Sequence, residues 1–285
     1  MQLHIRHETT YRYDLPVERS IQTLRLTPRT ESCQRVLSWT ISAPGRQAQQ
    51  VDAHGNVMHL LTMDGPHDEI RIVVGGTVET GDPANGLLGD DGRLSPLAYV
   101  TETTLTHADA ALRRFAADHG HLRPTRDQVL ALAGAVRDAM EYVPGATGVA
   151  DTAAHSFSLG RGVCQDHAHV LLACCRVLRV PARYVSGYVL TDDRGHVASH
   201  AWVDVWLEAE NGWLGVDATN RTLAGQQHCR LAIGRDYLDA CPVRGVRRGG
   251  GAEALSAKVL VSSTPDRVPA EQPKSRQMQR HQAQQ

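Results

Sequence analysis

The hydrophobic period of the chain changes near residue 100, from the period of strands to that of helices, and this change limits the possible folds. In the first part, apolar and polar residues alternate in short runs, among them 3–13, 21–27 and 36–41. Such runs, separated by turn residues and prolines, are typical of short antiparallel strands. We expect Pro16 to end the first strand, and we predict a β-sandwich domain over residues 1–80.

The second part begins beyond a stretch rich in glycine and proline at 81–100, which we interpret as a linker. Three segments have the composition or the apolar stripe of helices: 108–119, 125–141 and 163–178. Three alternating runs then predict strands: 183–190, 200–207 and 213–217. We therefore predict an α+β domain with a C-terminal strand over 101–262, and a disordered tail rich in proline and glutamine over 263–285.

Charge and cysteine usage narrow the functional classes. The chain has 30 Lys and Arg residues and 31 Asp and Glu residues, which gives a formal net charge of −1. This balance argues against nucleic acid as a partner and against a basic membrane-surface protein. The sequence has no recognisable secretory signal and no apolar stretch of about 18 residues that could span a membrane. The six scattered Cys residues then predict reduced thiols in the cytoplasm.

Cys164 is the first candidate for chemistry. It follows Gly160-Arg-Gly-Val163 and opens a predicted helix. At a helix N-terminus the dipole and the free backbone N–H groups favour the thiolate, which is the reactive form. The two glycines allow the backbone to approach a substrate closely. The same position also suits a small buried residue, since free cysteines are usually buried.

A predicted hairpin supplies two further candidates. In 200–207 the odd positions are apolar, and in 213–217 the even positions are apolar. If the two strands pair, their apolar faces must coincide, so even positions of the first strand lie beside odd positions of the second. His200 and Asp217 then share the opposite face. Three tryptophans lie along that face: Trp202, Trp206 and Trp213.

These positions suit a nucleophile, its base and an orienting acid. We expect Asp217 to accept the Nδ1 proton of His200, which leaves Nε2 facing the thiol of Cys164. The imidazolium would in turn stabilise the thiolate. Taken singly, His200 also fits a sheet-edge histidine, and Asp217 fits a turn or cap residue. The three together favour a Cys-His-Asp triad.

The segments around the triad resemble the transglutaminase-like superfamily, in its bacterial cysteine protease branch. The matching segments of the core are Gly162–His169, Val180–Tyr188, Ser199–Val203 and Gly212–Asp217. Others resemble the β domain that precedes the core in this branch, and its C-terminal run: His7–Tyr11, Arg25–Arg29, Asp52–Asn56, Gly234–Tyr237 and Arg244–Val246. The chain departs from the family pattern at His167, where an aromatic residue is usual, and at Ala218, where proline is usual.

The resemblance implies a papain-like or transglutaminase-like core, in which the helix of Cys164 packs on an antiparallel sheet that carries His200 and Asp217. It also implies attack on an amide carbonyl through a thioester acyl-enzyme, with the Cys164 backbone N–H as one oxyanion donor. Three more residues are expected to contact the substrate: Gly162, Gln165 and Trp202.

Three kinds of activity are open at this point. Hydrolysis of an amide bond is favoured in this bacterial branch, and transfer of the acyl group to an amine uses the same intermediate. A non-catalytic or zinc-binding module would use Cys164, His167 and His169, or the pair His228-Cys229, yet the spacing lacks two close ligand pairs. We expect a peptide or protein substrate and no cofactor or metal. A homo-oligomer is a further option, with the N-terminal domain as one place for self-association.

Overall fold

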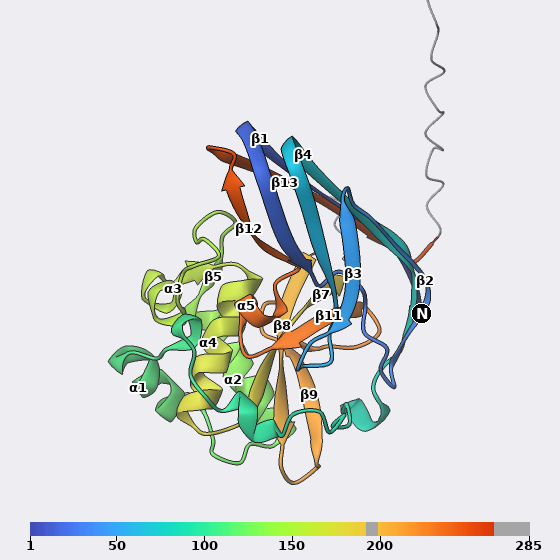
Figure 1. Ribbon diagram of the computed structural model, residues 1–285. Helices are drawn as coiled ribbons and strands as arrows, with labels where there is room; N and C mark the ends of the chain where they lie inside the picture. The colour runs from blue at the N-terminus through green and yellow to red at the C-terminus, as the bar shows by residue number, and fades with distance from the viewer. Residues whose placement is uncertain (192–198, 265–285) are drawn as a thin grey trace, which may run out of the picture.

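The computed structural model describes residues 1–191 and 199–264, in which two large antiparallel sheets lie beside a group of helices (Figure 1). Six strands form the first sheet: β1 (Gln2–Leu24), β2 (Gln34–Ser42), β3 (Arg46–Val51), β4 (Val57–Thr80), β12 (Val243–Gly249) and β13 (Glu253–Ser262). Five form the second: β7 (Ala182–Val189), β8 (Ser199–Leu207), β9 (Gly212–Asp217), β10 (Thr222–Leu223) and β11 (His228–Gly234).

The helices and shorter elements lie mainly between the two sheets in the sequence. The α-helices are α1 (Ala110–His119), α2 (Arg126–Ala139), α3 (Ala153–Leu159), α4 (Cys164–Val177) and α5 (Tyr237–Ala240). The short elements are η1 (Ala84–Gly86), η2 (Pro96–Tyr99), η3 (Thr104–Thr106), β5 (Glu141–Tyr142) and β6 (Arg161–Gly162). The α+β class with antiparallel sheets is thus confirmed.

The first sheet is built on two long strands, β1 and β4, which pair along most of their length. The first half of β1 also pairs with β13 and its second half with β12. Likewise, the first half of β4 pairs with β3 and its second half with β2. In the described residues all six strands therefore belong to one sheet, where we expected the two sheets of a sandwich. The long strands explain the difference, because each one supplies both halves of the sheet.

Pro16 lies inside β1 and does not end it, contrary to the prediction. The pairing of β1 with β4 shifts register between Arg12 and Val17, and Pro16 falls in this irregular stretch. Proline is tolerated at such a point because the ladder of backbone hydrogen bonds is already interrupted there. The strand then resumes its pairing from Val17 to Leu24.

The last two strands of the chain pair with β1, and so they lie in the N-terminal sheet. We had predicted that the C-terminal strand belongs to the core domain. Instead, β13 pairs with β1, and His4 lies opposite Ser262. Burial explains it, since Val259 of β13 joins the apolar layer around Leu3 and Ile5. Of the predicted tail, residues 265–285 lie outside the described residues.

The helices and the N-terminal sheet both pack against the second sheet. One face of that sheet packs on α4 through Ala201, Val203 and Val205 of β8. The N-terminal sheet packs at the β7–β11 edge of that sheet, where Leu3 and Ile5 lie in one apolar cluster with Tyr188 of β7 and Cys229 of β11. Figure 1 shows α1 to α4 gathered on one side of the molecule and the N-terminal sheet on the other. Hydrophobic burial against both parts fixes the sheet that carries the predicted catalytic residues.

Polar contacts also join the N-terminal region to the core. The side chain of Asn56 accepts from the Ile233 backbone N–H at 2.9 Å and donates to the Ile233 carbonyl at 2.7 Å. In the stretch predicted as a linker, Leu88 exchanges two backbone hydrogen bonds with Trp213. Residues of this stretch therefore pack on the core.

A buried ion network lies at the same boundary. Asp204 of β8 accepts from Arg183 Nε at 2.8 Å and from Arg230 Nη1 at 3.0 Å. Arg230 Nε also lies 2.7 Å from Glu31 Oε2, in the segment between β1 and β2. Burial alone would raise the pKa of Asp204, but the charges of Arg230 and Arg183 outweigh it and lower that pKa. The network is thus ionised, and it spans the two sheets.

Candidate active site

Cys164 is the first residue of α4, and its side chain is partly exposed. The first turn of the helix is held by Asp166, whose Oδ2 accepts from the Val163 backbone N–H at 2.7 Å and from Thr147 Oγ1 at 2.6 Å. Asp166 also accepts from Ser156 Oγ at 2.7 Å, and it is buried. A carboxylate in the first turn is stabilised by the helix dipole, so the position of Cys164 is rigidly defined.

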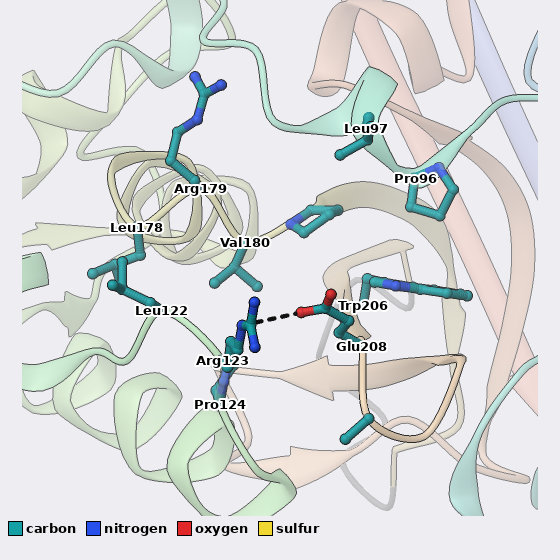
Figure 2. Close-up of a pocket in the computed structure, with 12 residues that line it drawn as sticks. Pro96, Leu97, Leu122, Arg123, Pro124, Leu178, Arg179, Val180, Trp206 and Glu208 are labelled. Carbon is teal, nitrogen blue, oxygen red and sulfur yellow. Dashed lines mark ion pairs between the residues drawn. The ribbon is translucent and has the colours of Figure 1, made fainter.

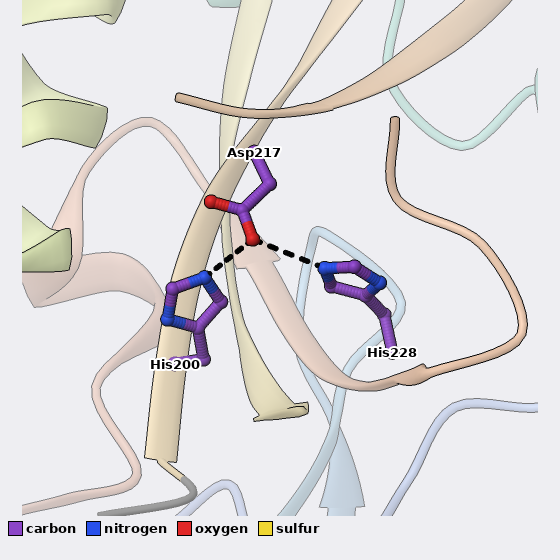
Figure 3. A group of neighbouring side chains, drawn as sticks. All are labelled: His200, Asp217 and His228. Carbon is purple, nitrogen blue, oxygen red and sulfur yellow. Dashed lines mark hydrogen bonds and ion pairs between the residues drawn. The ribbon is translucent and has the colours of Figure 1, made fainter. Parts of the chain in front are cut away.

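The predicted relation between His200 and Asp217 is confirmed in its geometry. The strands β8 and β9 pair with even positions opposite odd positions, for example Trp206 opposite Trp213. His200 and Asp217 consequently share one face, and His200 Nε2 donates to Asp217 Oδ2 at 2.7 Å (Figure 3). Asp217 is fully buried.

The two ring nitrogens of His200 are used in the opposite way to the prediction. We expected Nδ1 to face Asp217, but Nε2 makes this hydrogen bond. The register explains the exchange, because it continues from Val203 opposite Val216 to place Asp217 across from Trp202 and diagonally from His200. Diagonal neighbours in a sheet are about 7–8 Å apart, and only the distal nitrogen reaches that far. Nδ1 is therefore the nitrogen available to Cys164.

Hydrogen bonding sets the protonation of this pair. Burial by itself would lower the pKa of His200, but hydrogen bonds with Asp217 and with Cys164 outweigh it and raise the pKa to about 10. Burial would likewise raise the pKa of Asp217, whereas its hydrogen bonds with His200 and His228 bring it well below the usual range. Near neutral pH the pair is thus an imidazolium and a carboxylate.

The raised pKa of His200 predicts how stability depends on pH. Because this pKa is higher in the folded than in the unfolded chain, the stabilisation is complete below about pH 6.5 and is lost as the pH rises toward 10. The difference in unfolding free energy between wild type and Asp217→Asn should therefore shrink between about pH 6 and pH 10. Urea unfolding across this range measures it, and a constant difference would contradict the ion pair.

The three predicted substrate contacts have different surroundings. Gly162 is buried, and a side chain there would meet Asp166 at 2.6 Å, so packing explains the glycine. Gln165 donates from Nε2 to the Val149 carbonyl at 3.3 Å. Trp202 is only 1% exposed and stacks beneath His200 with ring centroids 6.2 Å apart. It therefore packs against the imidazole of His200.

Two polar residues of the site were missed by the sequence analysis. Asn220 donates from Nδ2 to Asp217 Oδ2 at 2.7 Å, and its backbone N–H donates to Oδ1 at 3.1 Å. His228, at the start of β11, lies with Nε2 3.2 Å from Asp217 Oδ2 (Figure 3). The Asn220 contact is local, and an Asp followed three residues later by Asn could have indicated it. The His228 contact depends on a crossover between strands that no local pattern predicts.

The histidines proposed for a zinc site are engaged elsewhere. His167 Nδ1 lies 3.0 Å from Thr219 Oγ1, and the His169 Nε2 accepts from the Tyr237 backbone N–H at 3.2 Å. His200, Asp217 and His228 do bring three possible ligand atoms within 4.8 Å of one another. Those atoms, however, are joined by hydrogen bonds in which the carboxylate already accepts from both rings. Hydrogen bonding to Asp217 Oδ2 therefore accounts for the arrangement of the three side chains.

A cavity of about 820 Å³ lies away from this site (Figure 2). It is lined by Leu178 and Arg179 beyond the end of α4 and by Trp206 at the end of β8. Cys164 begins the same helix, and 14 residues at about 1.5 Å each separate the two helix ends by roughly 20 Å. The cavity therefore has no direct part in the chemistry of Cys164.

A smaller cavity of about 330 Å³ lies closer to Cys164. It is lined by Val149, whose carbonyl binds Gln165, and by Tyr237 of α5. Its far wall belongs to the N-terminal sheet and includes Tyr11 of β1 and Leu255 of β13. Both parts of the chain therefore border the space beside the start of α4.

Comparison with known proteins agrees with this architecture. Residues 3–79 match the family model of the bacterial transglutaminase-like N-terminal region, and residues 113–218 match that of the transglutaminase-like superfamily. A solved structure from Cytophaga hutchinsonii, described as a "Putative Cysteine Protease", superimposes with a TM-score of 0.75 at 20% identity. The alignment covers 92% of this chain and 90% of that one. The fold is therefore of the transglutaminase-like class.

Two mycobacterial proteins are similar over nearly the whole chain. One from Mycobacterium leprae (strain TN) is 31% identical over 283 residues, which cover 91% of this chain and 98% of that protein. One from Mycobacterium tuberculosis (strain ATCC 25618 / H37Rv) is 32% identical over 271 residues, or 85% and 86% of the two chains. Both are described as uncharacterized. The chain belongs to the transglutaminase-like superfamily.

Proposed function

We propose that this protein is a cysteine-nucleophile hydrolase of amide bonds in peptides or proteins, acting through a thioester acyl-enzyme. The observation that carries the proposal is the 2.7 Å hydrogen bond between His200 and the buried Asp217, together with a Cys164 thiol close enough to His200 to help raise its pKa. In this series Cys164 is the nucleophile, His200 is the general acid and base, and Asp217 orients His200 and stabilises its charge.

The ion pair suits each step of the reaction. The Cys164 thiolate attacks the amide carbonyl, and the Cys164 backbone N–H is proposed as one donor to the oxyanion. His200 then gives its Nδ1 proton to the leaving nitrogen, the C–N bond breaks, and the thioester remains. Water next attacks the thioester as His200 takes up its proton, and the carboxylic acid leaves while Cys164 is regenerated.

Water is proposed as the acyl acceptor, with an amine as the alternative. Cys164 is partly exposed, which gives water access to a thioester at this position. The cavity between Val149 and the N-terminal sheet offers room for a polypeptide beside the helix start. The resemblance to the bacterial protease branch favours the same choice by analogy.

An amine competition experiment separates these two outcomes. The purified protein is incubated with a glutamine-containing donor peptide and a labelled primary amine, and both products are followed by mass spectrometry. We expect the hydrolysis product to accumulate faster than the amine conjugate, because water reaches the exposed thioester at high concentration. Amine incorporation that outpaces hydrolysis would instead assign the protein to acyl transfer.

A reducing compartment such as the cytoplasm is proposed as the place of action. All six cysteines are unpaired, which fits the thiol-based chemistry and a reducing environment. Within the described residues, no helix is both long and apolar enough to cross a membrane.

A further inference from the structure

Asp217 accepts an unusually complete set of hydrogen bonds for a carboxylate in a catalytic site. Its Oδ2 receives His200 Nε2 at 2.7 Å, Asn220 Nδ2 at 2.7 Å and His228 Nε2 at 3.2 Å. Its Oδ1 receives the Asn220 backbone N–H at 3.1 Å. The triad as proposed above requires only the first of these. The second imidazole, from a strand on the far side of β7, therefore needs an explanation.

The tautomer of His228 follows from its other ring nitrogen. The backbone N–H of Gly225 donates to His228 Nδ1 at 3.3 Å, so Nδ1 acts as an acceptor. The proton of the neutral ring must then be on Nε2, where it points at Asp217 Oδ2 (Figure 3). A backbone group thus fixes His228 as a hydrogen-bond donor to the carboxylate.

Packing holds the ring in this orientation. His228 is 7% exposed, and its ring packs against that of Trp202 in a T-shaped arrangement with centroids 5.1 Å apart. The same Trp202 stacks beneath His200. The two imidazoles therefore bind one carboxylate oxygen from different sides while they share one aromatic support, and neither ring can turn without disturbing the other.

We propose that His228 is a positioning residue of the active site, which fixes the Asp217 carboxylate toward His200. This inference rests on the proposed function, since it concerns the orienting acid of the Cys164–His200 pair. His228 lies beyond the reacting atoms and acts only through Asp217. Partners of this kind, one contact removed from the reacting groups, typically change activity about 10- to 100-fold when they are mutated.

A pair of nearly isosteric variants tests the hydrogen bond. His228→Gln keeps an N–H near the position of Nε2, whereas His228→Met fills a similar volume without a donor. We expect iodoacetamide labelling of Cys164 to slow about 10- to 100-fold in His228→Met, and to recover most of that loss in His228→Gln. Thermal unfolding of both variants verifies that the comparison is made on folded protein.

A double-mutant cycle tests whether His228 acts through Asp217. In an Asp217→Ala background, His228→Met should change labelling by less than about twofold, because the carboxylate that it positions is absent. A loss of equal size in both backgrounds would overturn the proposal, as would wild-type labelling in His228→Met alone.

An NMR measurement that does not depend on the reactivity of Cys164 tests the role of His228 separately from the proposed function. The Nε2 proton of His200 should be seen by NMR as a hydrogen-bonded signal, and it should exchange faster with water in His228→Met than in His228→Gln. Equal exchange in the two variants would overturn the role of His228. A wild-type protein whose Cys164 does not react would instead refute the proposed hydrolase, and the NMR comparison would still decide the positioning role.

Discussion

Replacing Cys164 with alanine is expected to abolish labelling by a thiol-directed activity probe and to lower amide hydrolysis by at least about 10⁴-fold. The reason is that the thioester cannot form without the Cys164 sulfur, and His200 then has no nucleophile to act upon. His200→Ala should also suppress labelling strongly, because the imidazole hydrogen-bonded to the thiol is lost. Mass spectrometry of the labelled protein identifies the modified residue in each variant.

Cys33 provides a matched control for this experiment. Its thiol is also partly exposed, but burial raises the pKa of Cys33 and leaves it mainly protonated. Cys33→Ala should therefore retain the labelling of the wild type. Labelling that persists in Cys164→Ala would mean that the nucleophile lies elsewhere in the chain.

Replacing Asp204 with alanine is expected to lower the free energy of unfolding by about 3–5 kcal/mol. Asp204 is fully buried and neutralises Arg183 and Arg230, both of which are also buried. Its removal takes the shared carboxylate away from both guanidinium groups, while Glu31 remains beside Arg230. The penalty comes mainly from cationic charge that remains in a poorly solvated place. Urea unfolding followed by circular dichroism measures the change.

The ion pair of Arg35 and Glu79 gives the corresponding surface control. The two side chains lie 2.8 Å apart but are 68% and 44% exposed, so Glu79→Ala should change stability by no more than about 1 kcal/mol. A loss in Asp204→Ala as small as that in Glu79→Ala would show that solvent or a rearranged side chain compensates the two arginines.

The site was predictable wherever it depends on the local geometry of neighbouring strands. The alternation in β8 and β9 was enough to place His200 beside Asp217, because pairing two strands by their apolar faces leaves one parity. The sequence pattern also predicted that Cys164 begins α4. The choice between Nδ1 and Nε2 was not predictable, because it depends on how many residues separate the two side chains across the ladder.

Features that depend on distant pairing escaped the sequence analysis. His228 reaches Asp217 although β8 and β7 separate β11 from β9 in the sheet, and no local repeat encodes this contact. The return of β12 and β13 to β1 is a similar case, since alternation predicts a strand but does not identify its partner. The prediction that Pro16 ends its strand was wrong because of a local feature. An irregularity in the long pairing of β1 with β4 accommodates a residue that usually ends a strand.

The closure of the N-terminal sheet by β12 and β13 has a consequence for the order of events during synthesis. The strand β1 leaves the ribosome well before its partners on one side, residues 243–262, which are made more than 200 residues later. The intervening core contains mainly nearer contacts and is free to fold first, while β1 carries an unpaired edge for most of translation. The wall that β1 and β13 contribute beside the start of α4 is therefore completed after the core, so a nascent chain gains this cavity only once β13 has emerged.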